Sequence, residues 1–346
     1  GVSLITYSKF CVLPALVAGF SLAAYPLFFS ESHFNIKDPP LAAFFGLTII
    51  TFYIGITKNK WKYMIASSIL AALTLGTKFN AVFIAPIVGI WLLFYLAQLI
   101  TKRKFKFINK RNIKKILPLI VSLILFPFIT IAVFYALWPY LWPDPIKNIA
   151  VIIGYYRQIG LGTPGELSRF LIQGWNTYPI VWIFYTTPIP ILALSVIGFL
   201  SSLYLSIFRK NNFAFLVLVW FLVPILRVSV PKTSLYGGVR QIMEFLPAMA
   251  ILAGIGAYSL FAFPKLIKKS TTVRKIVAAA ILLSLLLATY EMVRIHPNQN
   301  VYFNQLIGGL TGAKEKNIPY WGNTYGNVYL QGVKWLNENV EANAKL

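Results

Sequence analysis

Residues 31–41 read ESHFNIKDPPL, a polar loop between two apolar runs that are each long enough to cross a membrane. The loop brings Glu31, His33 and Asp38 close together, although the chain of 346 residues contains nine acidic residues and two histidines. This pattern predicts a membrane protein that gathers scarce ionisable side chains in the loop between two spans.

The composition is that of a multi-span membrane protein rather than a soluble domain. Hydrophobic residues make up 58% of the chain and charged residues 12%, and the mean hydropathy is +0.70. We therefore expect an all-α polytopic transmembrane helical bundle, because helices satisfy their own backbone hydrogen bonds in lipid. Nine apolar windows are predicted to be spans, at 10–29, 39–56, 62–77, 80–100, 116–137, 180–207, 213–230, 239–262 and 275–293.

The charges divide between the two ends of these spans. More than half of the 32 basic residues, and none of the nine acidic ones, fall at one end, at Lys9, 58–62, 102–115, 209–210 and 265–275. Basic loops are typical of the cytoplasmic side, so the acidic loops and the C-terminal tail are predicted to be extracytoplasmic. The net charge of +23 then follows from topology and from attraction to membrane lipid, and we expect no nucleic-acid partner.

Two candidate sites for charged ligands lie at the predicted external ends of spans. Lys78 stands in the turn GTKFN, where it either reaches lipid headgroups or presents a compact positive charge to a phosphate. Arg240 and Glu244 are four residues apart, which predicts that they share one helix face. They either pair with each other or face a wet cavity.

The remaining external segments are a loop and a tail. Aromatic residues and prolines in the loop at 138–179 favour a chain lying at the membrane interface, as a belt of anchors or as a wall that shapes a substrate site. Residues 1–293 are predicted to form the membrane bundle, and 294–346 the start of a small external domain with a helix near 328–340. His296 is expected to be a structural hydrogen-bonding residue rather than a metal ligand.

Four segments, in this order and spacing, carry a resemblance to a known family. They are SHFNIKDPPLAAFFGL (32–47), ASSILAALTLGTKFNAVFIAPI (66–87), YGGVRQIMEFLPAMAILAGIG (236–256) and HPNQNVYFNQLIGGLTGAKEKNIPYWGNTYG (296–326). The chain resembles the polytopic lipid-sugar glycosyltransferases of the protein O-mannosyltransferase type, which include the aminoarabinose transferases and the Rgt-like enzymes. The resemblance extends over nearly the whole chain.

The resemblance implies an activity, partners and site residues. It implies inverting transfer of a sugar from a polyprenyl-phosphate donor to a protein, lipid or glycan acceptor at the external face. Asp38 would lie beside the donor phosphate or a divalent cation, Mg or Mn, and Glu31 is the second catalytic candidate. The candidates for substrate binding are Lys78, Arg240, His33, Glu244 and Tyr236. Glu31 and His33 have a simpler alternative role, which is to cap the chain between two spans.

One departure from the family pattern concerns the general base. In the family, an aspartate in the first external loop takes the proton of the acceptor. The first span here matches the family's third, so the chain is expected to lack that loop. The alternative function is a transporter, flippase or ligase-like protein that binds a lipid-linked sugar without this chemistry. Transporters of that kind commonly carry duplicated halves, and the sequence shows no such duplication.

Overall fold

Helices form nearly all of the regular structure. The computed structural model describes residues 1–101, 110–162, 165–235, 237–266, 271–322 and 328–341. The first half contains α1 (Val2–Lys9), α2 (Val12–Ala23), α3 (Pro26–Glu31), α4 (Asp38–Lys58), α5 (Trp61–Thr77), the 3₁₀ helix η1 (Phe79–Phe83), α6 (Ile84–Thr101), α7 (Lys110–Leu137), η3 (Pro139–Leu141) and α8 (Pro145–Gly160). The second half contains η4 (Gly165–Phe170), β1 (Leu171–Ile172), β2 (Trp175–Asn176), α9 (Tyr178–Thr186), α10 (Ile189–Ile207), α11 (Asn212–Leu226), η5 (Arg240–Phe245), α12 (Leu246–Leu266), α13 (Thr271–Arg294), η6 (Gln299–Val301), α14 (Gly309–Glu315) and α15 (Tyr329–Asn339).

The expectation of an all-α polytopic bundle is confirmed. Each of the nine predicted spans falls on helical segments, and 6 helices in the described residues are long and apolar enough to cross a membrane. The other three predicted spans, 10–29, 62–77 and 213–230, are shorter helices. The window 10–29 divides at Tyr25 because Pro26 begins α3, and 180–207 divides in the same way at Pro188.

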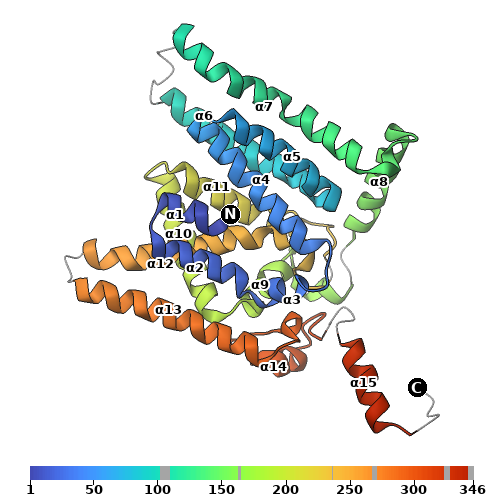
Figure 1. Ribbon diagram of the computed structural model, residues 1–346. Coiled ribbons are helices and arrows are strands. Elements are labelled where there is room, and N and C mark those ends of the chain that lie inside the picture. The colour runs from blue at the N-terminus through green and yellow to red at the C-terminus, as the bar shows by residue number, and fades with distance from the viewer. Residues whose placement is uncertain (102–109, 163–164, 236, 267–270, 323–327, 342–346) are drawn as a thin grey trace.

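The most buried helix, α12, lies at the centre of the bundle (Figure 1). It packs against α10 and α2, and the contact with α10 is made at glycines. A Cβ atom on Gly256 would lie 2.0 Å from the carbonyl oxygen of Leu194, and one on Gly198 would lie 1.8 Å from that of Leu252. Small residues of this kind let two membrane helices approach backbone to backbone, where van der Waals packing holds them.

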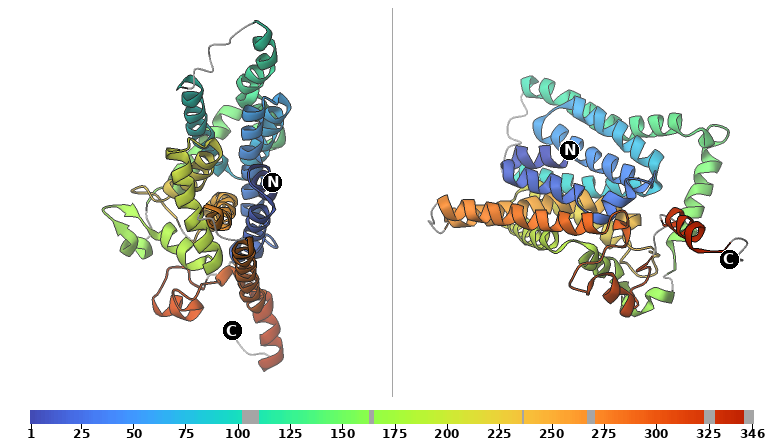
Figure 2. Two further views of the ribbon diagram at one scale, coloured as in Figure 1. Left: turned by 90° about the vertical axis from the view of Figure 1, so that its left-hand side faces the viewer. Right: turned by 60° about the horizontal axis from the view of Figure 1, so that its bottom comes forward.

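Helices α4, α5, α6 and α7 form a second group beside this centre, with α7 at its margin (Figures 1 and 2). Beyond α7, the chain continues into α8 and a short hairpin, whose strands β1 and β2 have two residues each. It then returns to the bundle at α9. Helix α8 carries many exposed apolar side chains, among them Ile146 and Tyr155. This exposure is consistent with a helix that lies at a membrane interface.

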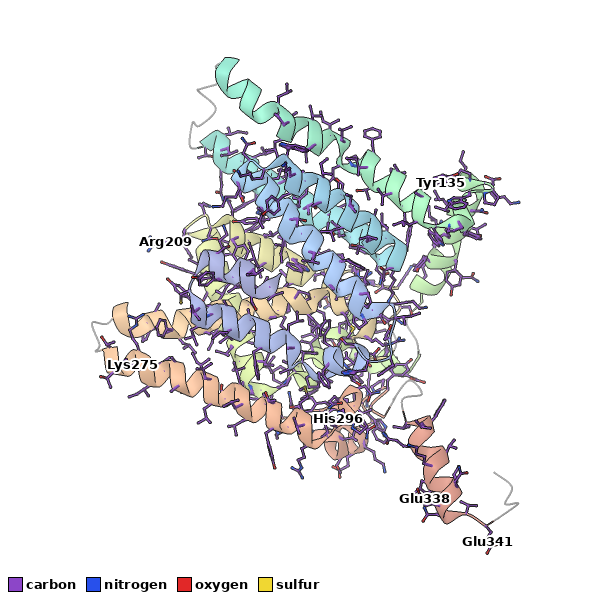
Figure 3. The ribbon with its side chains drawn as sticks, viewed as in Figure 1. Tyr135, Arg209, Lys275, His296, Glu338 and Glu341 are labelled. Atoms are coloured by element: carbon purple, nitrogen blue, oxygen red, sulfur yellow. The ribbon has the colours of Figure 1, made fainter. Side chains whose placement is uncertain are left out.

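Labelled side chains mark the two ends of the bundle. Arg209 and Lys275 lie at one end, and Tyr135 and His296 lie at the other (Figure 3). The second end is the one that carries the polar loop at 31–38. Residues 303–318, from the predicted external tail, pack there into the same apolar cluster as Trp182, while α15 lies apart from the bundle (Figure 1). The division into two domains at residue 293 stays a prediction.

Candidate active site

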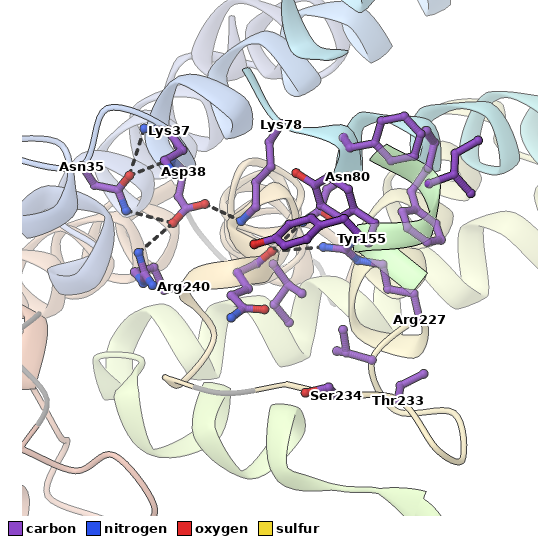
Figure 4. A pocket seen from close by; sticks show the side chains of 18 residues that line it. Asn35, Lys37, Asp38, Lys78, Asn80, Tyr155, Arg227, Thr233, Ser234 and Arg240 are labelled. Carbon is purple, nitrogen blue, oxygen red and sulfur yellow. Dashed lines mark hydrogen bonds and ion pairs between the residues drawn. The ribbon is translucent and has the colours of Figure 1, made fainter. Parts of the chain in front are cut away.

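A cavity of about 620 Å³ opens at the end of the bundle that carries the 31–38 loop (Figure 4). Its polar lining comes from the start of α4, the α5–η1 turn, the end of α11 and η5. Aromatic side chains of α8, Tyr155 and Tyr156, form a further wall. The polar and charged side chains that line it are Asn35, Lys37, Asp38, Lys78, Asn80, Arg227, Thr233, Ser234, Arg240 and Gln241.

The loop before α4 is organised by Asn35. Its side-chain oxygen accepts hydrogen bonds from the backbone N–H groups of Lys37 and Asp38, at 2.9 and 3.0 Å. This Asx-type turn sets the start of α4, where Pro39 and Pro40 occupy first-turn positions that need no N–H donor. The amide nitrogen of Asn35 lies 2.5 Å from Glu31 Oε2 and 2.8 Å from Asp38 Oδ2. One neutral amide therefore bridges the two carboxylates of the loop.

Lys78 reaches Asp38 from the opposite side. The helix α5 ends at Thr77, and Lys78 has an extended backbone with φ −161° and ψ 138°. Its Nζ donates to Asp38 Oδ1 at 2.6 Å, and its side chain is 18% exposed while that of Asp38 is 4% exposed. The predicted break between two spans is present, and it aims the lysine into the cavity rather than toward lipid headgroups.

Arg240 completes the group. Its Nη1 donates to Asp38 Oδ2 at 3.3 Å. The preceding Gly238 has φ +69°, and a Cβ atom there would lie 2.5 Å from the Trp182 ring. Glycine is needed at this turn for both reasons. Lys78 and Arg240 thus bind the two oxygens of a single carboxylate, so the structure brings these three candidate residues together.

The structure gives Arg240 and Glu244 different ion-pair partners, so their mutual pairing, one of the two alternatives, is not observed. Glu244 Oε1 accepts instead from Nη2 of Arg227 at 3.1 Å, and the side chains of Arg227 and Glu244 are 10% and 1% exposed. The backbone of η5 explains the difference, because it is a 3₁₀ helix with a non-helical residue, Ile242, at φ −122° and ψ 25°. Residues four apart no longer share one face in that geometry. Arg227 lines the cavity, and the sequence analysis did not select it.

Glu31 is a buried carboxyl group whose pKa is shifted by its surroundings. The side chain is fully buried, and its Oε1 has no hydrogen-bond partner among the described residues. Desolvation raises the pKa of Glu31, and the hydrogen bond from Asn35 opposes this shift. The cations Arg240 and Lys78 also favour the charged form. Glu31 lies behind Asn35 and is not part of the cavity wall.

The donor groups at Asp38 do not fit a divalent cation. Both carboxylate oxygens are already bonded to Lys78, Arg240 and Asn35, and four cations line the cavity. In the described parts of the chain, no group of three or more His, Cys, Asp and Glu side chains is placed to hold a metal ion. The Mg or Mn role of Asp38 stays a prediction that this arrangement does not favour.

Two further candidates lie elsewhere. His33 is exposed, its Nδ1 lies 2.7 Å from the carbonyl oxygen of Phe29, and it borders a separate hollow of about 430 Å³. Its position matches the simpler role of capping the chain after α3. Tyr236 lies outside the described residues.

Sequence comparison links the first third of the chain to a family of membrane enzymes. Residues 4–131 match the family model described as dolichyl-phosphate-mannose-protein mannosyltransferase. These residues include Asp38 and Lys78 but not Arg227 or Arg240. Among curated proteins, none matches the chain in sequence.

The fold is similar to that of archaeal oligosaccharyltransferases. One solved structure is AglB from Archaeoglobus fulgidus in complex with an inhibitory peptide and a dolichol-phosphate, with a TM-score of 0.51 and 14% identity over 98% of this chain and 45% of that one. A second is an Archaeoglobus fulgidus oligosaccharyltransferase tethered to an acceptor peptide, with a TM-score of 0.50 and 16% identity over 98% and 44% of the two chains. The chain spans less than half the length of these proteins.

The chain resembles membrane glycosyltransferases, in sequence over residues 4–131 and in overall fold. The resemblance drawn from the four sequence segments is thereby confirmed, and so is the expectation of a multi-pass membrane protein. At these identities the solved structures support the fold alone. The roles of the site residues are therefore argued from their own geometry.

Proposed function

We propose that this chain forms the donor-binding part of an integral-membrane glycosyltransferase that uses a polyprenyl-phosphate sugar and inverts the anomeric centre. The observation that carries the proposal is the meeting of Lys78 and Arg240 on the two oxygens of Asp38, within a cavity at one end of the bundle. The chemistry of this group suits a phosphate monoester or diester.

The balance of charge in the cavity favours an anionic ligand. Lys37, Lys78, Arg227 and Arg240 line it, and Asp38 is the one acidic side chain among the lining residues. Glu244 neutralises Arg227 from behind. Asp38 is shared between two cations, so positive charge remains for a phosphate, and charged hydrogen bonds in a poorly solvated site are stronger than neutral ones.

An apolar groove beside the cavity suits the lipid part of the donor. It has a volume of about 470 Å³ and lies between α4, α5, α6 and α7, and its walls include Phe126 and Leu92. Val82 borders both the groove and the cationic cavity. A ligand with a phosphate head and an isoprenoid tail would occupy both spaces at once, whereas a soluble sugar phosphate would leave the groove empty.

The chemistry assigned to the site is a single displacement. The acceptor oxygen or nitrogen attacks the anomeric carbon from the face opposite the phosphate, and the bond between that carbon and the phosphate oxygen breaks with its electron pair. Lys78 and Arg240 stabilise the negative charge that develops on the departing phosphate. Asp38 holds both cations in place. The proton of the acceptor passes to a general base, a role that the family pattern gives to an aspartate of the first external loop.

We assign the cavity to the extracytoplasmic side. The basic loops gather at the opposite end, as cytoplasmic loops do. The acceptor, whether a protein, a lipid or a glycan, is taken from the family resemblance. The peptides in the two solved structures are ligands of those proteins.

The second candidate function is a transporter or flippase that binds the same lipid-linked sugar. The two functions differ in product. A transferase releases polyprenyl phosphate and joins the sugar to an acceptor, whereas a flippase leaves the glycosidic bond intact. The confined cluster of cations at one end of the bundle favours the transferase, because transporters place their binding sites near the bilayer midplane.

Photo-crosslinking with a polyprenyl phosphate that carries a diazirine in its first isoprene units tests the donor assignment. We expect label within residues 81–92 and 123–131, the segments of η1, α6 and α7 that border the groove. Val82→Trp should block the junction and reduce labelling several-fold. The matched control is Leu93→Trp, since Leu93 lies on α6, which directly follows η1, is 70% exposed and does not border the groove. Equal labelling of both variants, or label spread evenly over exposed helices, would show that the lipid does not bind here.

A further inference from the structure

A second cationic cavity lies at the end of the bundle opposite the proposed donor site. Its volume is about 360 Å³. It is bordered by the end of α1, by Tyr53 of α4 and by the link between α10 and α11. The lining residues are Lys9, Phe10, Tyr53, Arg209, Lys210, Asn211, Asn212 and Phe213.

Lys9 is the least solvated cation of this group. Its Nζ lies 4.6 Å from the centre of the Tyr53 ring and 5.7 Å from that of Phe213. Burial, together with the nearby Lys58, lowers the pKa of Lys9. None of the ion pairs among the described residues includes Lys9, Arg209 or Lys210.

These contacts leave the cluster without a counter-charge. Cation–π contacts attract the charge but do not neutralise it. Three cations that share one hollow also repel each other, more strongly where water is partly excluded. A bound anion would remove both the repulsion and the cost of partial desolvation.

The start of α11 adds to the attraction for an anion. Asn211 caps this 15-residue helix, and its side-chain oxygen accepts from the N–H groups of Phe213 and Ala214 at 3.0 and 2.9 Å. The cap is neutral, so the positive end of the helix dipole is not offset there. The cap residue Asn211 and the first helical residue, Asn212, border the cavity together with the three cations.

The apolar surroundings indicate where the anion comes from. Val12 and Leu16 of the neighbouring α2 are 57% and 56% exposed, as lipid-facing side chains are. The cavity therefore lies at the level where a span meets the membrane surface, next to phospholipid headgroups. Acidic headgroups are concentrated in the cytoplasmic leaflet, and nearby Lys and Arg side chains attract them.

We propose that the cavity formed by Lys9, Arg209, Lys210 and the start of α11 is a binding site for a phosphate group, which an acidic phospholipid of the adjoining leaflet supplies. This site is separate from the donor cavity, and it does not depend on the proposed glycosyltransferase function.

Native mass spectrometry of the full chain, with phosphatidylglycerol and phosphatidylcholine added in equal amounts, tests the site. We expect retained phosphatidylglycerol, and roughly tenfold weaker retention in the triple variant Lys9→Gln, Arg209→Gln, Lys210→Gln. The matched control removes the same charge from the same end, by Lys60→Gln, Lys62→Gln and Lys275→Gln, which are exposed residues outside the cavity. This control should retain the lipid.

A second experiment distinguishes a phospholipid headgroup from free phosphate as the ligand. Thermal unfolding in lipid-free detergent compares sodium phosphate with sodium chloride at equal ionic strength. Stabilisation by phosphate that the cavity triple variant loses would support the site with free phosphate as the ligand. Equal loss of lipid in both triple variants would show a diffuse field instead of a site, and retention of neither probe by the wild type would also overturn the proposal.

Discussion

Asp38 and Lys78, 40 residues apart in the sequence, are joined by a hydrogen-bonded ion pair of 2.6 Å in which both side chains are largely removed from solvent. Arg240 binds the other oxygen of the same carboxylate. A charge pair this short in a partly buried site holds its groups in a fixed geometry before any ligand arrives. Asp38 therefore acts as the organiser of the two cations that we assign to the donor phosphate.

The first prediction separates the organising role of Asp38 from a role in binding. Asp38→Asn removes negative charge from the cavity, so binding of polyprenyl phosphate should be unchanged or tighter. The rate of sugar transfer, relative to that of an active wild-type protein, should fall about 10-fold or more. The reason is that Lys78 and Arg240 lose the carboxylate that fixes their positions. Glu315→Gln, an exposed acid of α14, is the control and should leave both quantities unchanged. Weaker binding of the lipid by Asp38→Asn would contradict this division of roles.

The second prediction concerns the buried pair of Arg227 and Glu244. Arg227→Met should lower the free energy of unfolding by about 3–5 kcal/mol, since it leaves Glu244 buried and unpaired. Glu244→Gln should be destabilising for the same reason. The double variant Arg227→Met, Glu244→Met should be less destabilised than the sum of the single variants. Thermal unfolding of all variants in one detergent measures the coupling, and additive effects would show that the pair contributes nothing.

Much of the fold could be predicted because the hydrophobic spans are read directly from composition and length. Pro26 and Pro188 divide two of the windows, and this too follows from a local rule. The site was only partly predictable. Lys78 and Asp38 stand out as charges at the ends of spans. Arg227, by contrast, lies inside a predicted span and is fixed by a partner 17 residues away.

Asn35 and Glu244 show two reasons why the sequence did not predict the whole site. One is the geometry of a loop, and the other is the type of helix. Asn35 is uncharged, and its bridging role depends on a loop geometry that composition does not reveal. A local signal did exist, since an Asn two or three residues before a helix start commonly accepts backbone hydrogen bonds. For Glu244, the i,i+4 rule assumed an α-helix where the chain forms a 3₁₀ turn.

The third prediction tests how the Gly-Gly turn positions Arg240. Gly238→Ala places a methyl group against Trp182 at a backbone φ of +69°, so it should lower stability by roughly 1–3 kcal/mol and weaken donor binding. Gly76→Ala is the control, because a Cβ atom there meets nothing within 4 Å and Gly76 lies within α5. That change should be neutral or slightly stabilising. Unaltered stability of Gly238→Ala would contradict the described turn.

The fourth prediction concerns pH and Glu31. Burial raises the pKa of this carboxyl in the folded state, so the folded protein holds its proton more tightly than the unfolded chain. Its contribution to stability is therefore complete below the unfolded pKa and is lost as the pH rises through the folded pKa. Glu31→Gln should remove this part of the pH dependence, which lies in the pH range above the ordinary pKa of a glutamate carboxyl.

The melting temperature of Glu31→Gln, compared with that of the wild type across this range, gives the measurement. Glu338→Gln, an exposed acid on α15, should follow the wild-type curve. If Glu31→Gln reproduces the wild-type curve at every pH, then the Glu31 carboxyl has the same pKa in the folded and unfolded states, and the prediction is wrong.

Direct binding of a short-chain polyprenyl phosphate to the purified chain in detergent tests the central claim, which is that Lys78 and Arg240 form the donor-phosphate site. Lys78→Gln and Arg240→Gln should each raise the dissociation constant by about 10-fold or more, the scale of one lost charged hydrogen bond. Lys60→Gln, which removes an exposed charge at the far end, should leave it unchanged. If both site variants remain folded and bind the lipid phosphate as tightly as the wild type, the cavity is not the donor site and the account is wrong.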